Sequence, residues 1–216
     1  TNVATAEVTV NAAAFISNAA IVSTGAVSVN NNAAAYAKAE IEVSDVNVGL
    51  VAIGAVVTNA SAGVIFKAYI LNSEIKSSSL EVKNNYKADA YALAEQPKVA
   101  VTFVATDVNN ATATVSTSAV AFVEGGEINV TGKLTVQNDG VIKAYALVKA
   151  PTVSVTGGRV LVSTATANLT ADQKAYISGG AISAGEGTYV ISNQNKDLTD
   201  EGAKAELGAA GVAVSG

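Results

Sequence analysis

The sequence has 216 residues and a net charge of -5; half of its residues are apolar, 5% are aromatic, and Arg159 is its one arginine. This acidic balance argues against binding to nucleic acid or to an anionic membrane surface, because both need a basic patch. The sequence holds no Cys and no His, which excludes thiol and imidazole chemistry, and no run reaches the roughly 18 apolar residues of a membrane helix, so we expect no membrane insertion.

Alternation of apolar residues begins near the N-terminus, with Ala4, Ala6 and Val8 at every second position. A period of two is typical of strands with one buried face. The Ala-rich stretch 33–39 would also suit a helix, but its counterparts 87–94 and 142–148 alternate in the same way around a tyrosine. We therefore predict strands at all three places.

One motif occurs four times and consists of Ala, an aromatic residue, Ile or Val, four mostly small or polar residues, and Ile. Its aromatic residues are Phe15, Tyr69, Phe122 and Tyr176, at successive spacings of 54, 53 and 54 residues. Internal repetition at such a period indicates a stacked architecture. We expect the four rings to form one stack and to be buried.

A second repeated feature follows each aromatic residue, namely an apolar residue with Asn two positions later. The four asparagines are Asn31, Asn84, Asn138 and Asn193. Asn tolerates the left-handed backbone region and can hydrogen-bond within its own turn. We therefore predict a ladder of these side chains at strand ends that enter tight turns.

The openings Thr58-Asn59, Asn109-Asn110 and Ala167-Asn168 divide the chain into four repeats of about 54 residues. Their ranges are 1–57, 58–108, 109–166 and 167–216, all within a single domain that covers 1–216. A solenoid counts as one continuous domain whatever its length.

The most charged stretch, residues 196–207, has two interpretations. It could be a short helix with Thr199 as N-cap and acidic residues in the first turn, as the helix dipole favours. It could instead be a charged strand at the place where earlier repeats have Ala-Tyr-Ala.

These features together predict an all-β fold, a parallel β-solenoid, with the right-handed form favoured because the hexapeptide pattern of the left-handed form is absent. Each repeat would make two or three coils, and coils spaced by about 4.8 Å would give a rod about 40–60 Å long. The alternative is an antiparallel, immunoglobulin-like β-sandwich, which has no need for four equal repeats.

Three segments carry a resemblance to a known family: residues 111–115 (Ala-Thr-Ala-Thr-Val), 126–138 and 49–54. They resemble the repeats of very large bacterial exoproteins, the filamentous-haemagglutinin and leukotoxin-like adhesins. The resemblance implies a right-handed β-helix stalk that is secreted to the cell surface and used for attachment. The family's N-terminal secretion region has no counterpart here, so we expect an excerpt of a longer array or a subunit that joins end to end.

Catalysis needs acids, bases or nucleophiles that converge on one place. Arg159 follows Gly157-Gly158 in an expected turn, and Asp45, Asp107 and Asp139 are scattered. We expect no enzymatic activity, no metal and no cofactor; the alternatives are a β-helix enzyme that cleaves polysaccharides and an ice-binding solenoid. Ice binding is suggested by Thr112-Ala113-Thr114 and its counterpart at 164–166, although threonine is not kept in all four repeats.

Four asparagines lie in the Asn-x-Ser/Thr pattern that accepts N-linked sugar: Asn59, Asn110, Asn129 and Asn168. Three of them stand near the start of a repeat, so we expect them at one shared and exposed position.

The sequence thus predicts a non-enzymatic, structural or adhesive rod of a secreted bacterial surface protein. Its expected partners are a glycan or protein receptor on a host cell or surface, and other copies of the chain stacked end to end. The first and last residues, 1–6 and 211–216, already resemble repeat sequence, so both terminal coils should meet further coils.

Overall fold

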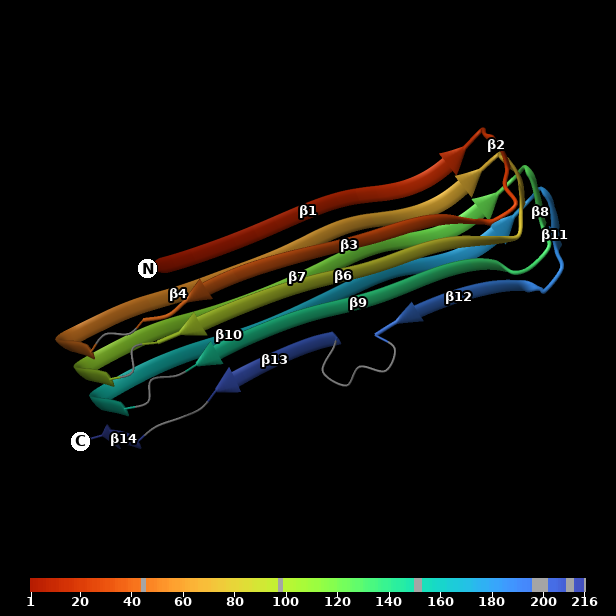
Figure 1. Ribbon diagram of the computed structural model, residues 1–216. Helices are drawn as coiled ribbons and strands as arrows, with labels where there is room; N and C mark the ends of the chain where they lie inside the picture. Colours follow the sequence, from red (N-terminus) through yellow and green to blue (C-terminus); the bar gives the residue numbers. More distant parts are fainter. Residues whose placement is uncertain (44–45, 97–98, 150–152, 196–201, 209–211, 216) are drawn as a thin grey trace.

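The computed structural model of the protein describes residues 1–43, 46–96, 99–149, 153–195, 202–208 and 212–215, and all of its sheets are parallel (Figure 1). The first sheet has the strand order β1-β4-β7-β10-β14, the second β11-β8-β5-β2 and the third β12-β9-β6-β3, with β13 also paired to β9. Within the described residues there is no helix, and hence none long and apolar enough to cross a membrane. The parallel pairing excludes the antiparallel sandwich and agrees with the β-solenoid architecture.

The strands are β1 (Asn2–Ser17), β2 (Ala20–Val22), β3 (Ala26–Ile41), β4 (Val46–Leu71), β5 (Glu74–Ser77), β6 (Ser79–Glu95), β7 (Val99–Glu124), β8 (Glu127–Val130), β9 (Leu134–Lys149), β10 (Val153–Ser178), β11 (Ala181–Ala184), β12 (Thr188–Gln194), β13 (Gly202–Gly208) and β14 (Val212–Ser215). The Ala-rich stretch 33–39 lies in β3, so the prediction of a strand there is confirmed. Each of the repeat boundaries at 58, 109 and 167 falls inside a long strand, β4, β7 or β10.

One circuit of the chain consists of a long strand, a short strand and a returning strand (Figure 1). Asn2 pairs with Val56, Val56 with Asn109, and Asn109 with Ser163, so each circuit advances the pairing by 53 or 54 residues. The expectation of two or three coils per repeat is therefore wrong, because each repeat length makes one wide coil. A strand of 26 residues spans roughly 85 Å, whereas four coils stack to only about 15–20 Å.

Left-handed backbone turns connect the long strands to the short ones. The residues at this position are Asn18, Asn72, Gly125 and Gly179, with φ angles of 50°, 46°, 66° and 65°. Glycine and asparagine are the residues that adopt this conformation most readily. The asparagines at these turns are thus Asn18 and Asn72, which belong to the aromatic motif.

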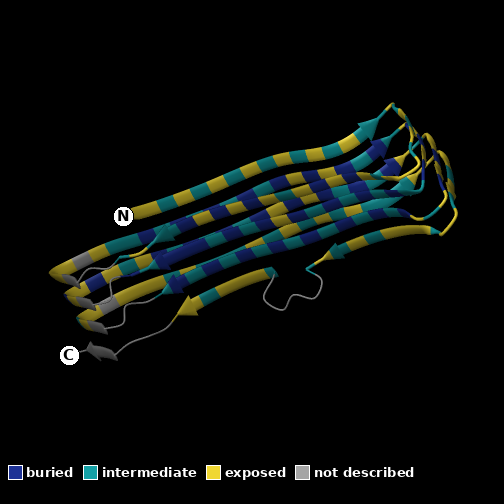
Figure 2. Cartoon of the chain, viewed as in Figure 1, coloured by how far each residue is buried: buried dark blue, intermediate teal, exposed yellow. Residues whose placement is uncertain are grey.

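The core lies between the long strands and the returning strands, and the alternation of buried and exposed residues is visible along both (Figure 2). Most of its wide part is alanine, as at Ala62, Ala90 and Ala113. Larger aliphatic residues, such as Ile70, Leu80 and Ile128, fill the end next to the short strands. Since alanine leaves little side-chain bulk between the two sheets, the coil is flat.

The charged stretch near the C-terminus includes a strand. In β13, Ala203, Lys204 and Ala205 pair with Ala144, Tyr145 and Ala146 of β9. The strand interpretation is confirmed for 202–207 and the helix is wrong there; residues 196–201, including Thr199, lie outside the described residues.

Candidate functional surfaces

The four repeated aromatic rings form one continuous stack. Their centroids are 5.2, 4.9 and 5.1 Å apart in sequence order, with interplanar angles of 8°, 2° and 6°. The expectation that they are buried is wrong: they lie on the outer face of the long sheet, and Phe15 is 58% exposed. Their neighbours Ala68, Ile70, Ala121 and Val123 occupy the interior instead. Because the rings cover one another's faces, the stack is a structural feature rather than an open platform for a sugar.

Asn31, Asn84 and Asn138 also form a ladder, but inside the molecule and within strands rather than at turns. The side-chain amide of Asn31 donates to Asn84 Oδ1 at 2.9 Å, and that of Asn84 donates to Asn138 Oδ1 at 2.9 Å. Each amide also donates across the core to a carbonyl of the long sheet, at Ala12, Phe66 or Ala119. The ladder thus ties the two large sheets together while leaving its own polar atoms satisfied.

Asn193 does not belong to this ladder. Ser192 pairs with Asn138, and Asn193 pairs instead with Asp139 on the outer face. There the Asn193 amide donates to Asp139 Oδ1 at 2.8 Å. The prediction that Asn193 joins the ladder is therefore wrong, because the spacing from an apolar residue to Asn does not fix the strand register.

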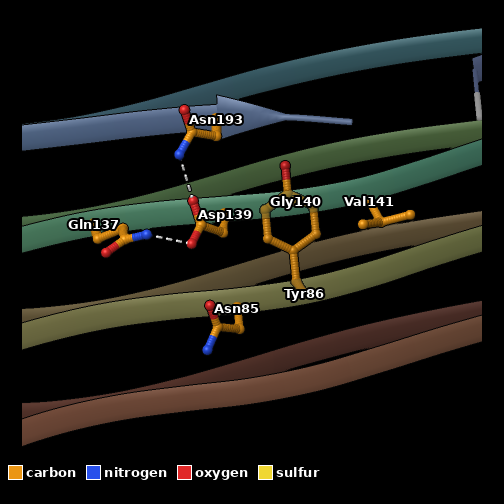
Figure 3. A pocket seen from close by; sticks show the side chains of 7 residues that line it. All are labelled: Asn85, Tyr86, Gln137, Asp139, Gly140, Val141 and Asn193. Atoms are coloured by element: carbon orange, nitrogen blue, oxygen red, sulfur yellow. Dashed lines mark hydrogen bonds between the residues drawn. The ribbon is translucent and has the colours of Figure 1, made fainter. Parts of the chain in front are cut away.

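A shallow polar pocket of about 350 Å³ surrounds Asp139 on the outer face of the returning sheet (Figure 3). Both carboxylate oxygens of Asp139 accept hydrogen bonds, one from Asn193 and one from the amide of Gln137. The ammonium of Lys83 lies 3.9 Å from the same carboxylate. These groups satisfy one another, and no group of three or more acidic residues suited to a metal occurs within the described residues.

Beyond this pocket, the returning sheet presents a row of tyrosines and lysines. Lys38 lies 5.7 Å from the ring centroid of Tyr91, Tyr91 lies 5.5 Å from Tyr145, and Lys204 lies 5.5 Å from Tyr145. The hydroxyl of Tyr145 donates to Glu206, and this bond, aided by partial burial, raises the pKa of Tyr145 to about 12. Cation–π and carboxylate contacts therefore hold β13 on β9.

The four candidate glycosylation residues all lie in strands. Asn129 and Asn168 are exposed, whereas Asn59 and Asn110 are half-buried. Asn59 pairs with Thr112 and not with Asn110, and Asn168 pairs with Thr114. The expectation that three of them share one position in the repeat is therefore wrong.

Hydroxyl and amide side chains cover the middle of the outer long sheet. One row across the strands is Thr5, Asn59, Thr112 and Thr166, and the next is Glu7, Ser61, Thr114 and Asn168. Neither row is uniform, and an asparagine interrupts the threonines in the first. The surface is polar and flat, but it lacks an unbroken threonine array.

An apolar band covers the beginning of the same outer face, where exposed residues are visible at the starts of the long strands (Figure 2). We define the apolar band as Val51, Ile53, Val104, Val108, Val160 and Val162, which lie in neighbouring rows of β4, β7 and β10. Ile53 is 83% exposed and Val51 is 68% exposed. No charged residue belongs to the three rows that contain the band.

Next to the apolar band is a hollow of about 710 Å³, with Val48, Leu50, Val101, Phe103 and Val155 among its lining residues. Leu50 is 81% exposed and Phe103 is 68% exposed. Contiguous exposed apolar surface of this kind is rare on monomeric soluble proteins and marks sites of interaction.

Candidate reactive residues do not come together in the described part of the chain. Asp107 pairs with Leu161 and Gly54, whereas Asp139 belongs to the polar pocket on the other large sheet. The side chain of Arg159 and all of Asp45 lie outside the described residues.

No protein-family model, no curated protein and no solved structure matches the chain.

Proposed function

We propose that the chain is a non-enzymatic structural and adhesive segment of a secreted bacterial surface protein. The observation that supports this role best is the apolar band, which is exposed on the outer face of the long sheet. A surface with these residues gains about 25 cal/mol for each Å² of apolar area that a partner removes from water. The resemblance to the repeats of filamentous-haemagglutinin-like adhesins points to the same role and to a cell-surface location.

Within this proposal the fold is a right-handed β-solenoid of four repeats. The support for the hand is general: a connection that leaves a strand and returns to a parallel neighbour in the same sheet is right-handed in about 98% of cases. The links from β1 to β4, from β4 to β7 and from β7 to β10 are of this type.

The partner proposed for the apolar band is a protein receptor rather than a glycan. The band is aliphatic, its rows hold no charged residue, and the faces of the repeated aromatic rings are covered by one another. Sugar recognition relies on exposed aromatic faces and polar groups, whereas core regions of protein interfaces are apolar and depleted of charge.

Adhesion of beads coated with the chain to cultured host cells tests the proposal. We expect Ile53→Ser, combined with Val51→Ser and Val160→Ser, to reduce bead attachment at least about tenfold, which corresponds to 1.4 kcal/mol. The matched control is Val22→Ser, since Val22 is 81% exposed but lies on β2, outside the band. Protease treatment of the cells should abolish attachment and glycosidase treatment should leave it; the opposite pattern, or equal attachment by the triple variant, contradicts the proposal.

A further inference from the structure

Within the described residues, the interior is only partly covered at both ends of the coil stack. The inward residues of β1, among them Ala6, Val8 and Val10, are only partly buried, whereas Ala60 and Ala62 in β4 are fully covered. At the other end, Ala165, Ala167 and Leu169 of β10 are likewise partly buried.

The backbone edges at the two ends are open as well. Among the described strands, β1 pairs only with β4, and β10 pairs with β7 on one side and with β14 on the other over Val153–Thr156 alone. Open edges of this length are templates for pairing with another strand.

We propose that a second copy of this chain stacks its first coil on the last coil of the first copy, head to tail and in the register that the chain already uses. This inference rests on the proposed role as a structural segment of a secreted surface protein. The interface between coils occurs three times within the chain, through β1–β4, β4–β7 and β7–β10. The proposed contact continues it once more, with Asn2 of the second copy on Ser163.

The inward rows match across this junction. Continued register places Ala4 and Ala6 of the second copy on Ala165 and Ala167, Val8 on Leu169, and Ile16 on Ile177. The short strands continue the match, with Ile21 of the second copy on Ile182. Each of these pairs places aliphatic on aliphatic, so both open ends of the core become covered.

The outward rows match too. Phe15 of the second copy falls on Tyr176, which extends the ring stack, and Thr9 falls on Thr170. Asp172 falls beneath Asn11 of the second copy, the same amide-on-carboxylate pairing that joins Asn193 to Asp139 at 2.8 Å. One row is unfavourable, because Lys38 of the second copy falls on Lys204 and two like charges meet. Each of these lysines forms an ion pair with a glutamate in its own strand, Glu40 or Glu206.

The segment β14 does not obstruct this junction. It ends at Ser215, which pairs with Thr156, whereas β1 of the second copy would begin at residue 163. The two strands therefore occupy different parts of the same edge.

A complementation experiment with the full chain tests both the contact and its polarity. Val8→Glu places a charge at the open core of the first coil, and Leu169→Glu does so at the last coil. An unpaired charge that must be buried costs several kcal/mol, so each variant should weaken its own end at least about 100-fold. In sedimentation velocity, the unaltered 21.5 kDa chain should form oligomers that grow with concentration, and each variant alone should remain monomeric.

An equimolar mixture of the two variants should form a dimer and no larger species, because each variant keeps one intact and complementary end. Thr9→Glu, on the outward face of β1, is the matched control and should still assemble. Circular dichroism of each variant must first show native strand content; if Val8→Glu unfolds, Ala6→Lys replaces it, because a lysine can extend its ammonium out of the open end.

Three results overturn the proposal: an unaltered chain that stays monomeric at high concentration, a mixture that forms no dimer, or a dimer of Leu169→Glu alone, which would mean that first coils pair with each other. Bead adhesion by the assembly-deficient variants separates the two proposals. If they attach as the unaltered chain does while stacking fails, the adhesive role stands without the stacking. If stacking occurs while no chain attaches to cells, the stacking stands and the adhesive role is wrong.

Discussion

Asn84 lies at the centre of the interior ladder, and its side chain should contribute strongly to the free energy of unfolding. Its side chain accepts from Asn31 and donates to Asn138 and to the carbonyl of Phe66, and the residue is fully buried. Leaving buried polar groups without partners costs about 1–3 kcal/mol each. We expect Asn84→Ala to lower the free energy of unfolding by about 2–4 kcal/mol, measured by denaturant titration.

The neighbouring residue supplies the control. Asn85 points outward and donates to Asn32 at 2.9 Å on an exposed face. Asn85→Ala should change the free energy of unfolding by no more than about 0.5 kcal/mol, as is usual for surface substitutions. Equal losses for the two variants would mean that the interior ladder is not a special source of stability.

Gly140 is fixed by the ring that lies over it. A Cβ atom at this position would lie 2.2 Å from Cζ of Tyr86, whose ring packs on Phe66 with centroids 5.5 Å apart. We expect Gly140→Ala to destabilise the fold by about 1–3 kcal/mol through overpacking. In a double-mutant cycle, Gly140→Ala should become close to neutral when Tyr86→Ala has removed the ring; an unchanged cost would place the effect in the backbone.

Two tyrosines should make the fold sensitive to alkali. Burial raises the pKa of Tyr86 to about 12, and the hydrogen bond to Glu206 raises that of Tyr145 to about 12. An unfolded tyrosine ionises near pH 10, so the stability that these protonated hydroxyls contribute is complete below about pH 10 and is lost as the pH rises towards 12. Thermal unfolding between pH 9 and pH 12 should show this loss, and Tyr86→Phe and Tyr145→Phe should each reduce its slope.

Spectrophotometric titration of tyrosinate gives an independent check. In denaturant all seven tyrosines should ionise together, whereas in the native chain Tyr86 and Tyr145 should ionise late, and burial raises the pKa of Tyr91 and Tyr176 as well. If Tyr86→Phe leaves the late fraction unchanged, burial does not protect this hydroxyl.

At the scale of elements, the aromatic stack stabilises the outer face of the long sheet. Tyr69 contacts the rings of both Phe15 and Phe122, with centroids 5.2 and 4.9 Å away. Because it is only partly buried, Tyr69→Ala should cost about 1–2 kcal/mol rather than the roughly 3 kcal/mol of a core aromatic. Tyr36→Ala, at a residue that is 55% exposed, is the control.

A double-mutant cycle isolates the ring contact itself. Tyr69→Ala and Phe122→Ala should show a coupling of about 0.5–1.5 kcal/mol, as for other aromatic pairs. Additive effects of the two substitutions would mean that the rings align through strand register alone.

The strand alternation and the alignment of the aromatic motif could be predicted from sequence, but the strand ends and the direction of several side chains could not. The spacing of Phe15, Tyr69, Phe122 and Tyr176 fixes their alignment, yet each aromatic stands between two apolar residues, so alternation alone does not say which one faces inward. Size favours burying the ring. At this motif the interior is filled by alanine and medium aliphatic residues such as Ala68, Ile70 and Val123, and the rings lie outside.

The inward direction of the asparagine ladder could have been predicted from the alternation of residues in β3. Val27, Val29, Asn31 and Ala33 share one parity, so Asn31 belongs to the inward set of β3. The sequence nevertheless favours placing Asn31 in a turn, because burying an amide without a hydrogen-bond partner is costly. The acceptors that make burial possible for Asn31 and Asn84 lie in strands far away in the sequence, so the sequence does not reveal them. The number of coils per repeat could not be predicted either. The sequence contains no clear signal that a single strand runs for 26 residues without a turn.

At the scale of the whole molecule, the protein is a flat stack whose stability should decrease from the middle coils to the ends. Strands β6 and β7 each have a paired neighbour on both sides, and β1 has one on a single side within the described residues. Solenoids are stabilised by contacts between adjacent repeats, so a coil with one neighbour has about half of the stabilising interface.

Amide hydrogen exchange at residue resolution tests this arrangement. In a parallel strand, successive amides point alternately to the two sides, so every second amide of β1 should exchange quickly in the monomer while the others are protected. Amides of both classes in β6 and β7 should exchange slowly. As the concentration rises into the range of head-to-tail stacking, the fast class of β1 and the open-edge amides of 163–178 should become protected together, whereas those of 157–162 should not. Protection that rises at one end only, or evenly along all strands, would contradict the paired role of the two ends.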